Sequence, residues 1–508
     1  MRLRMAVLTD LHYDSADAPS HADRRGDIAH VLLLRAVYRM KRLLHPDVLA
    51  IPGDVLDEGR SPRAPGDMAE LKQRLDRLEI PRLILPGNHD CDTPTFQQAF
   101  GQVPEWLDVN GFRLVPLIDP EEAGFNAHRT EQNFHRIDRA REGYAGPLIA
   151  VHHVPVFPEG TTGSPYNYVN AGSVIDNMRR NGCCLALSGH YHHGFHTRDD
   201  DIDFVCAAAT CVSPFPVTIV DLDWEPGTGC ATRSGHPCPQ VRVSRHNLRL
   251  PESLSLVDCH VHTQFAYCGE DTDVNRVLAL SADMGLADVA FSEHSNQLYF
   301  DAASCHRAPA LDRSWEQHAS PHDRRMDDYL DLLRRVVPPR SRGFEVECSH
   351  TGGHILAGPD ARHAAFLIGG MHQLAELEKP VPAAEKLADD FLAAADRFTA
   401  SGINVLAHPF RVFRRTGLTA PPELFDPLVR MLRERNVAAE INFHTNEPPE
   451  AFFRLCLDAG VPIAFGSDTH NLYELGDFAL HLDFLKRCGF DGDPMDVIID
   501  PRRLNPRR

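Results

Sequence analysis

The chain has 508 residues, a formal net charge of −19 at neutral pH, and a composition that is 43% hydrophobic and 24% charged. At roughly 150 residues per domain this length exceeds one ordinary core, so two large domains or three small ones are expected. The acidic balance disfavours a broad electrostatic grip on nucleic acid, and no apolar run approaches the roughly 18 residues of a membrane span.

The N-terminus, MRLRMAVLTD, passes from a short apolar run directly into acidic residues. It lacks the long apolar core and small-residue cleavage site of a signal peptide, so a cytoplasmic protein is expected. The thirteen cysteines are odd in number and show no paired metal-ribbon spacing, which predicts that the chain has no structural disulfides.

In the first half, short apolar runs alternate with helical patterns at residues 28–44 and 68–78, which indicates an α/β layout. The runs occupy residues 4–9, 47–53, 82–87, 147–153 and 183–189. Each ends in a His, Asp or Asn cluster, at the carboxyl ends of strands where α/β proteins build their sites. The Gly- and Pro-rich segment 157–172 is predicted to be a long functional loop.

The ligand candidates of this half are Asp10 and His12 in "DLH", Asp54 in "GDVLD", Asn88 in "GNHD", His152 in "VHH", and His190 and His192 in "GHYH". Their oxygen and nitrogen donors suit Zn, Mn or Fe. The two carboxylate oxygens of Asp54 allow it to bridge two cations about 3.5–4 Å apart. Such a centre activates water for hydrolysis near neutral pH and attracts phosphate to a chain that is acidic overall.

This ordered series resembles the calcineurin-like metallophosphoesterases, and "HHVP", "YVNAG" and "SGHYHHGF" are similar to their cyclic-nucleotide phosphodiesterase branch. The resemblance implies a four-layer α/β/β/α sandwich over residues 1–250 that holds two ions of Mn, Fe or Zn. It implies one metal on Asp10, His12, Asp54 and His192, and another on Asp54, Asn88, His152 and His190. It gives catalytic roles to Asp54, the shared ligand, and to His89, the acid or electrostatic partner at the leaving oxygen. His153 and His193 are expected to shape the rim, and Asp57 and Asp90 to be supporting groups.

Segment 224–240 is predicted to be a turn between late β-strands, and the domain boundary is placed near residues 249–253. The second half then contains seven strand-like runs separated by helical segments, an arrangement typical of a barrel with polar residues at its C-terminal rim. The runs lie at residues 254–262, 288–294, 343–347, 364–372, 403–409, 437–443 and 462–470.

Candidate ligands again lie at the ends of these runs: His260, His262, Cys268, Glu293, His294, Glu345, His372, His408, Asp468 and His470. They resemble the PHP (polymerase and histidinol phosphatase) superfamily, which implies a distorted (β/α)7 barrel over residues 254–490, followed by a tail at 491–508. The resemblance implies two or three ions of Zn, Mn or Fe. It places the first on His260, His262, Glu345 and Asp468, the second on Glu345, His372 and His408, and the third on His294 and His470.

Cys268 stands where this family often has histidine, and a thiolate there can bind zinc. Otherwise the site holds two metals. Glu347 shares a strand face with Glu345 and rivals it as the bridge. Arg411 is a candidate for bidentate phosphate binding, with a solvated surface arginine as the alternative. His306, His350 and His354 are expected to be surface groups.

Both sets of motifs suit hydrolysis at phosphorus. The sequence therefore predicts a bifunctional phosphohydrolase for a small phosphorylated metabolite, in which an N-terminal phosphodiesterase and a C-terminal phosphomonoesterase act in sequence. A cyclic nucleotide or another cyclic phosphodiester is the candidate substrate of the N-terminal domain. Two alternatives stay open: a nuclease that processes nucleic-acid ends, which salt-dependent nucleic-acid binding would favour, and a binding or scaffold protein with one degenerate domain. The oligomeric state does not follow from the sequence.

Overall fold

The structure is a computed structural model that describes residues 1–16, 21–225, 235–307, 311–312, 315–319, 325–379, 383–415 and 417–504. It divides into two compact units, Met1–Arg249 and Leu250–Arg508. The predicted turn at 224–240 and the predicted tail at 491–508 lie partly outside the described residues. Of the helices in the described ranges, none has both the length and the apolar composition required to span a bilayer.

The N-terminal unit contains two sheets. The first has the order β13-β12-β1-β2-β3, in which β1, β2 and β3 are parallel. Its strands are β1 (Arg2–Val7), β2 (Val48–Ile51), β3 (Arg82–Ile84), β12 (Pro216–Asp223) and β13 (Gln240–Asn247). The second has the order β10-β11-β9-β8-β5-β4. Its strands are β4 (Leu107–Val109), β5 (Phe112–Pro116), β8 (Leu148–Val151), β9 (Cys183–Ser188), β10 (Phe195–Asp199) and β11 (Ile202–Cys206).

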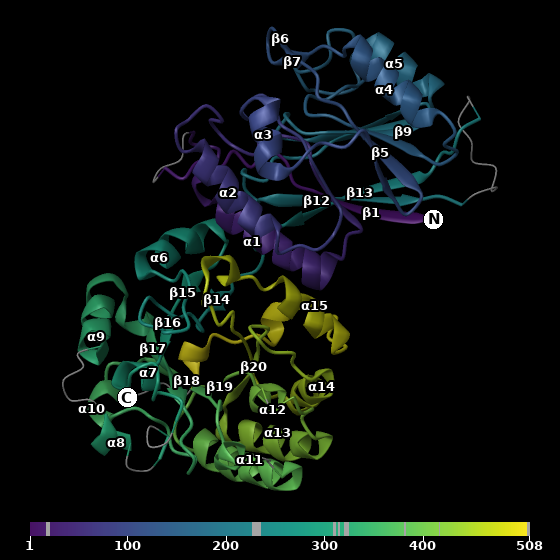
Figure 1. The fold of residues 1–508 in the computed structure, drawn as a ribbon. Helices are drawn as coiled ribbons and strands as arrows, with labels where there is room; N and C mark the ends of the chain where they lie inside the picture. The colour runs from purple at the N-terminus through teal and green to yellow at the C-terminus, as the bar shows by residue number, and fades with distance from the viewer. Residues whose placement is uncertain are drawn as a thin grey trace. The chain divides into compact units, whose positions relative to one another are not determined.

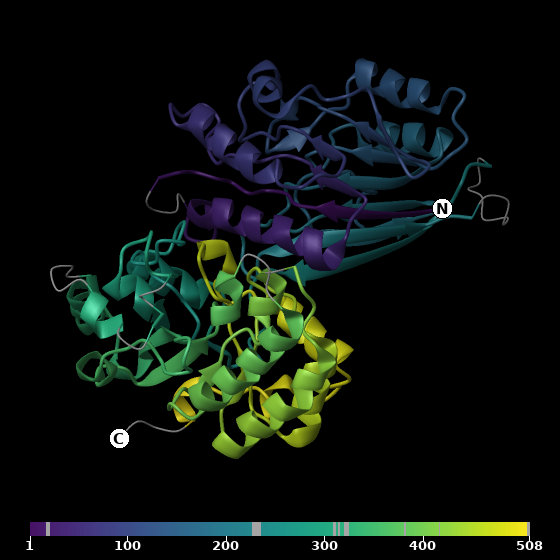
Figure 2. The same cartoon turned by 60° about the horizontal axis from the view of Figure 1, so that its bottom comes forward.

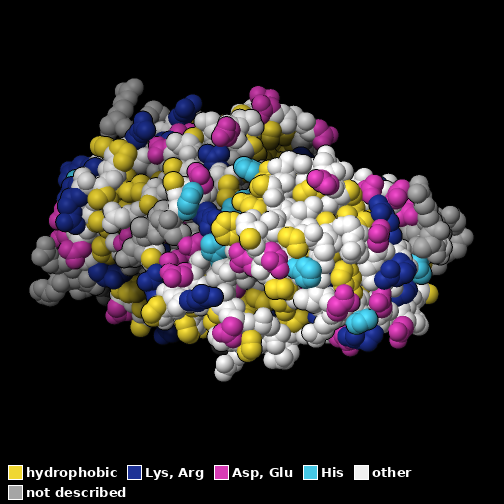
Figure 3. All heavy atoms as spheres, turned by 90° about the horizontal axis from the view of Figure 1, so that it is seen from above, with side chains coloured by type: hydrophobic (Ala, Val, Ile, Leu, Met, Phe, Trp, Pro, Cys, Tyr) yellow, Lys and Arg dark blue, Asp and Glu magenta, His cyan; other side chains and the backbone are white. Residues whose placement is uncertain are grey.

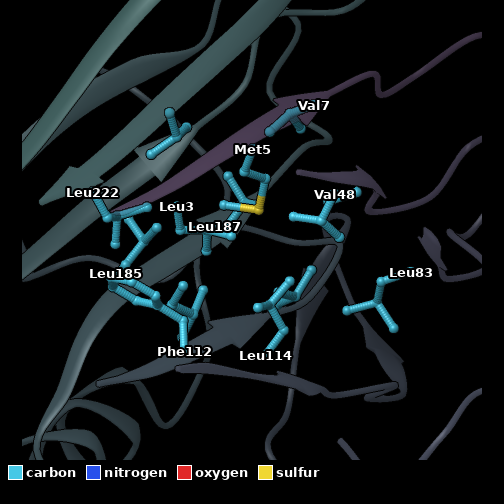
Figure 4. Close-up of a cluster of buried hydrophobic side chains, with 14 of the residues drawn as sticks. Leu3, Met5, Val7, Val48, Leu83, Phe112, Leu114, Leu185, Leu187 and Leu222 are labelled. Atoms are coloured by element: carbon cyan, nitrogen blue, oxygen red, sulfur yellow. The ribbon is translucent and has the colours of Figure 1, made fainter. Parts of the chain in front are cut away.

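The core of this unit lies between the two sheets (Figure 4). Leu3, Met5 and Val7 alternate along β1, so they share one face and meet Leu185 and Leu187 of β9. Helices α1 (Ala29–Arg39) and α2 (Ala64–Leu75) cover the other face of the first sheet, and α4 (Glu131–Arg141) and α5 (Ala171–Arg180) that of the second (Figures 1 and 2). The unit is therefore a mixed α/β fold of four layers.

The unit also contains a short helix and a small hairpin. Helix α3 (Thr93–Phe100) follows the "GNHD" segment, and Asp92 caps it by accepting from the Thr95 N–H at 3.1 Å. Strands β6 (Glu121–Glu122) and β7 (Asn126–Ala127) form a hairpin. The loop 157–172 runs beside this hairpin, because Ala127 pairs with Tyr168.

The C-terminal unit is built on parallel strands with helices between them (Figure 1). One small sheet pairs β14 (Val257–Asp258) with β15 (Asp288–Val289). The larger sheet runs in chain order through β16 (Phe291–His294), β17 (Arg342–Glu347), β18 (Phe366–Gly370), β19 (Val405–Leu406), β20 (Ala438–Ile441) and β21 (Ile463–Phe465). The helices are α6 (Val274–Asp283), α7 (Ser295–Tyr299), α8 (Trp315–His318), α9 (Arg325–Val336), α10 (Gly358–Ala361), α11 (Ala384–Thr399), α12 (Arg411–Arg415), α13 (Phe425–Arg435), α14 (Glu450–Ala459) and α15 (Ala479–Arg487).

The strand ladders of the described residues do not close into a barrel, because β14–β15 and β16–β21 remain separate sheets. The chain after β14 meets the chain after β21 at two isolated parallel bridges, Val261–Thr469 and Asp271–Asn471. Strand β14 ends at Asp258, whose carboxylate accepts the N–H groups of His260 at 3.3 Å and Gly476 at 3.0 Å. Backbone hydrogen bonds still connect this segment to both neighbours, through the Ser292 N–H to the Val261 carbonyl oxygen at 2.9 Å and the His262 N–H to the Thr469 carbonyl oxygen at 3.2 Å.

The segment predicted as a C-terminal tail packs into the unit as far as Leu504. Leu504 is 4% exposed and belongs to a core cluster with Phe366 and Ile368 of β18. The Asn404 side chain donates to the Leu504 carbonyl oxygen, and Ile498 forms a bridge to Ile463 of β21. This segment is therefore part of the fold. Of the twelve cysteines within the described ranges, eleven are buried and Cys268 is exposed.

Candidate metal centres

In the N-terminal unit, ligand side chains follow the strands of both sheets directly. Asp10 and His12 follow β1, Asp54 follows β2, and His190 follows β9. All four have positive φ angles, of 51°, 46°, 51° and 70°. Such backbone costs about 1–3 kcal/mol per residue and clusters at functional sites, where the surroundings hold it in place.

A first group of donors gathers around His12. Its Nε2 lies 3.6 Å from Asp54 Oδ2, 3.9 Å from Asp10 Oδ1 and 3.2 Å from His192 Nε2. His192 Nε2 is in turn 3.5 Å from Asp10 Oδ1. Metal–ligand bonds of about 2.1 Å place adjacent ligand atoms about 3.0–3.4 Å apart and opposite ones up to about 4.2 Å apart, so these distances are compatible with one divalent cation.

The second group contains His153 and not the predicted His152. His153 Nε2 lies 3.3 Å from Asp54 Oδ2, 3.0 Å from Asn88 Oδ1 and 3.2 Å from His190 Nδ1. The ring of His152 is fully buried on the other side of the strand, with Nδ1 2.6 Å from the Val154 carbonyl oxygen. Adjacent strand residues point to opposite faces, and the sequence "HH" does not say which faces the site.

Supporting groups hold these ligands in place. Asp57 Oδ1 lies 3.2 Å from His12 Nδ1. Asp90 accepts the N–H groups of Leu56 at 2.8 Å and Gly87 at 2.8 Å, which ties together the loops that carry Asp54 and Asn88. Burial, reinforced by the charge of Asp54, raises the pKa of Asp90 to about 7.

His89 lies beside both groups. Its N–H donates to Asp54 Oδ1 at 2.9 Å, its Nδ1 is 2.7 Å from the Asp57 carbonyl oxygen, and its ring centroid is 4.7 Å from that of His12. His193, as predicted for a rim residue, is exposed and contacts the Tyr191 ring.

The buried charges are strongly linked. Burial opposes ionisation of Asp54, but His153 and His12 outweigh it and hold the pKa of this carboxyl below its ordinary range. Burial likewise disfavours the imidazolium of His153, yet Asp54 raises the pKa of His153 to about 9. This position therefore favours a positive charge, and a divalent cation supplies one.

In the C-terminal unit, two carboxylates face two histidines at the centre of the predicted site. His260 Nε2 lies 3.5 Å from Glu345 Oε2 and 3.4 Å from Asp468 Oδ1. His262 Nε2 lies 3.6 Å and 3.0 Å from the same two atoms. All four side chains are at most 1% exposed. The predicted first set of ligands therefore lies together.

Glu345 also reaches the predicted second set. Its Oε1 is 3.0 Å from His408 Nε2 and 3.5 Å from His372 Nε2, so its two oxygens face two groups, as a bridging carboxylate requires. Glu347, the predicted rival, instead lies 2.7 Å from His372 Nδ1 and accepts the His372 N–H at 3.1 Å. Burial, reinforced by Arg411, lowers the pKa of His408 to about 3, and a metal requires this neutral form of histidine.

A third group forms around Cys268. Its Sγ lies 3.1 Å from His470 Nε2 and 3.5 Å from His294 Nε2, and it accepts from Gln297 Nε2 at 3.4 Å. Burial opposes the thiolate, but His294 outweighs it and lowers the pKa of Cys268. A thiolate with two imidazoles is a donor set suited to zinc.

Two carboxylates orient the ligand histidines from behind. Glu293 Oε1 lies 3.2 Å from His262 Nδ1. Glu440, which the sequence did not single out, lies 2.6 Å from His260 Nδ1 and accepts the His408 N–H at 2.9 Å. The available signal was a carboxylate inside the buried run 437–443, because Glu is almost never fully buried without a partner.

Arg411 was expected either to bind phosphate or to lie on the solvated surface. It is instead 2% exposed, and its Nη2 donates to Asp468 Oδ2 at 2.5 Å. Its guanidinium therefore supports a ligand carboxylate. Arg415, one helical turn further, is exposed and interacts electrostatically with Glu347, Glu345 and Asp468. His306 lies at the same edge, with its ring 6.3 Å from that of His372, although a plain surface position was expected.

The donor chemistry of both centres fits divalent metal ions. Glu345 Oε2 is buried and faces three imidazoles, with His294 Nδ1 at 2.6 Å, His260 Nε2 at 3.5 Å and His262 Nε2 at 3.6 Å. Burying a carboxylate costs free energy that such partners, or a metal ion, offset. His350 and His354 are not among these donors. They lie on the loop after β17, where His354 forms an antiparallel β-bridge with Cys348.

In a comparison with known protein families, one family matches part of the chain. Residues 3–194 match the family described as calcineurin-like phosphoesterase. No curated protein sequence matches the chain. Among solved structures, the chain is similar to a dimetal phosphatase from Danio rerio, with 14% identity and a TM-score of 0.37 over 47% of this chain and 98% of that one.

Two further similar structures are larger than the matched region. A purple acid phosphatase from yellow lupin (Lupinus luteus) has 13% identity and a TM-score of 0.33 over 49% of this chain and 52% of that one. A 5′-nucleotidase precursor from Thermus thermophilus has 13% identity and a TM-score of 0.32 over 49% of this chain and 54% of that one.

Proposed function

Because residues 3–194 form a calcineurin-like phosphoesterase domain, a metal-dependent phosphoester hydrolase, we propose that the whole chain is a bifunctional phosphohydrolase. Its N-terminal unit is a phosphodiesterase and its C-terminal unit a phosphomonoesterase. The observation that carries this proposal is that each unit has its own buried centre with one carboxylate facing two donor groups, Asp54 in the first and Glu345 in the second.

The N-terminal centre is proposed to hold two ions of Mn, Fe or Zn, which together supply Lewis acidity and an activated water when bound. The chain itself supplies Asp54 to hold both positions, and His89 to transfer a proton to the leaving oxygen. His89 is kept in position by its N–H bond to Asp54. The motif similarity of "HHVP" and "SGHYHHGF" favours a small, cyclic phosphodiester as substrate.

The C-terminal unit is proposed to be a PHP-type phosphomonoesterase with a distorted barrel fold and two or three ions of Zn, Mn or Fe. Donors at the ends of successive strands support this, including Glu345 of β17 and His372 after β18. Cys268, His294 and His470 are proposed to hold the third ion. Arg415 replaces Arg411 as the proposed contact for the substrate phosphate.

The two sites are proposed to act in sequence on one small metabolite in the cytoplasm: the first opens a diester and the second removes the resulting monoester phosphate. The exposed thiol of Cys268 supports a reducing compartment. Asp54→Ala and His260→Ala variants, loaded with Mn, Zn or Fe, test the order on cyclic diesters. We expect the Asp54 variant to leave the diester intact, and the His260 variant to open it without releasing inorganic phosphate.

The control is the matching monoester, which the Asp54→Ala variant should dephosphorylate at the wild-type rate. If the His260→Ala variant releases as much phosphate from the diester as the wild type, the sequential proposal is wrong. If neither variant differs from wild type on either ester, the assignment of the two centres is wrong as well.

A further inference from the structure

A cavity of about 790 Å³ lies at the amino ends of strands in the C-terminal unit. Its wall includes Leu256 directly before β14, Ala287 directly before β15, and Arg340 two residues before β17. The proposed metal ligands lie toward the carboxyl ends of the strands, as His260 does after β14, and barrel-like folds carry their catalytic residues at that end. The cavity is therefore a separate site from the metal centre.

The C-terminal segment 495–503 forms one side of this cavity. It runs beside β21, because the Ile499 N–H donates to the Ile463 carbonyl oxygen at 2.9 Å and Ile498 forms a parallel bridge to the same residue. Met495, Ile498 and Ile499 line the cavity and are each only half-buried. The segment thus presents an apolar wall that a ligand can contact.

Arg502 offsets the charge of the two carboxylates that line the cavity. Its Nη1 donates to Asp288 Oδ2 at 2.7 Å, and its Nη2 donates to Asp500 Oδ2 at 2.8 Å. The Arg502 side chain is only 11% exposed, so water weakens these charge-assisted bonds little. Asp288 and Asp500 are therefore held by a guanidinium that a ligand need not displace.

Two further arginines have more loosely held guanidinium groups. Arg340 Nη2 lies 3.5 Å from Asp288 Oδ2, and Arg503 Nε lies 3.8 Å from Asp500 Oδ2, both longer than ordinary hydrogen bonds. Their side chains are 75% and 81% exposed. Because three arginines and two aspartates line the cavity, its lining carries one net positive charge. A ligand with a single negative charge complements it.

We propose that this cavity binds a small organic monoanion with an apolar body. Its anionic group contacts the guanidinium groups of Arg340 and Arg503, which can bind a carboxylate through two parallel N–H bonds. Its body lies against Met495 and Ile498. The volume falls within the range of about 300–1,000 Å³ that is typical of small-molecule sites. The proposal goes beyond the proposed hydrolysis, because it concerns neither metal centre.

The test uses octanoate, which joins a carboxylate to an apolar chain, and the metal-loaded full chain. Isothermal titration calorimetry should detect one octanoate bound per chain. Arg340→Gln and Arg503→Gln should each raise Kd about tenfold, the value of one charge-assisted hydrogen bond. Met495→Ala should raise Kd by a similar factor through lost apolar contact. Arg335→Gln, an exposed arginine of α9 outside the cavity, should keep the wild-type Kd. Wild-type Kd values in both Arg340→Gln and Arg503→Gln would overturn the proposal.

Two analogues separate the charge from the apolar body. Octanamide keeps the chain length without the charge, and acetate keeps the charge without the body. Each should bind at least about tenfold more weakly than octanoate. Equal binding of octanamide would show that the arginines do not select an anion, and equal binding of acetate would reduce the site to adventitious ion binding. Either result would contradict the proposal.

Carboxylates also bind metal ions, so the two centres need their own control. Asp54→Ala and His260→Ala should bind octanoate as tightly as the wild type, because both residues lie outside the cavity. Loss of binding in either variant would place the anion at a metal centre and reject the proposed site.

Occupancy of the cavity should also raise the unfolding temperature of the C-terminal unit, because a ligand that binds only the folded state stabilises it. Limited proteolysis during heating assigns the transition to its unit. A double variant with Arg340→Gln and Arg503→Gln should show a smaller shift than the wild type at the same octanoate concentration. A shift confined to the N-terminal unit would place the ligand outside this cavity.

Discussion

His152 and His153 are chain neighbours whose side chains meet opposite surroundings. His153 lies 3.3 Å from Asp54 and shares the centre with His190. His152 packs its ring 5.5 Å from that of Tyr168, and burial, reinforced by Arg129, lowers its pKa to about 3. One imidazole is thus available to a cation, while the other is a neutral group of the interior. Substitution of each histidine is therefore expected to change a different property, metal binding for His153 and stability for His152.

His153→Ala is expected to lose metal from the N-terminal centre and to lower kcat/KM for diesters at least about a hundredfold, because one ion contributes several kcal/mol to the transition state. His152→Ala should keep the metal and lose about 2 kcal/mol of stability through the cavity it leaves. Elemental analysis and thermal unfolding of the two variants measure both effects. The reverse outcome, metal loss in the His152 variant alone, would contradict the placement of these rings.

Glu440 is the residue that connects two ligands of the C-terminal centre from behind. Replacing it by Gln keeps its shape but removes the charge next to His260 Nδ1, from which its Oε1 lies 2.6 Å. Removal of such partners typically costs 10–100-fold in metal affinity or activity, and we expect a loss within this range. Metal titration and phosphatase assays measure it, with Glu434→Gln, on the exposed face of α13, as the control. Unchanged affinity and activity would show that Glu440 does not orient the ligands.

At the scale of elements, the sequence predicted which strands end in ligands but not every side chain that faces the site. Contiguous apolar runs predicted the strands β1, β2, β8 and β9, since strands buried on both faces contain few polar residues. The choice between His152 and His153 depends on the register of one strand, which periodicity does not give where two histidines adjoin. The seven apolar runs predicted one barrel, whereas the strands of the described residues form two separate sheets, β14–β15 and β16–β21.

Helix α12 carries three arginines, of which Arg411 is buried while Arg414 and Arg415 are exposed. Arg411 is committed to Asp468, so Arg411→Ala should leave a buried carboxylate unpaired and destabilise the C-terminal unit by about 3–5 kcal/mol. Arg415→Ala should leave stability unchanged and raise KM for monoesters about tenfold or more, the value of a charge-assisted contact. Arg414→Ala, exposed between them, is the control. A wild-type KM in the Arg415 variant would exclude it from phosphate binding.

At the scale of the whole molecule, the formal charge of −19 coexists with two buried centres rich in imidazoles. On the face shown in Figure 3, acidic and basic side chains are interspersed, which suits a small-molecule enzyme better than an electrostatic track for nucleic acid. The division into two units follows from motif order along the chain. That the metal-ligand candidates of each unit lie together could be expected from their places at strand ends. The carboxylates that contact these ligands from behind, such as Glu440, could be identified only from the packed structure.

Metal removal provides a test at this scale. Bound ions stabilise the folded state by mass action, by about 2.7 kcal/mol at a hundredfold excess over Kd, which is about 5–10 °C in Tm for a unit of this size. Chelation should therefore lower the unfolding temperature of both units, and re-addition of Mn or Zn should restore it. In the Asp54→Ala variant only the C-terminal unit should still respond, and in the His260→Ala variant only the N-terminal unit. Limited proteolysis during heating assigns each transition to its unit. An unchanged response in both variants would mean that the ions bind elsewhere, because Asp54 and His260 lie within the two donor clusters that would otherwise lose their cations.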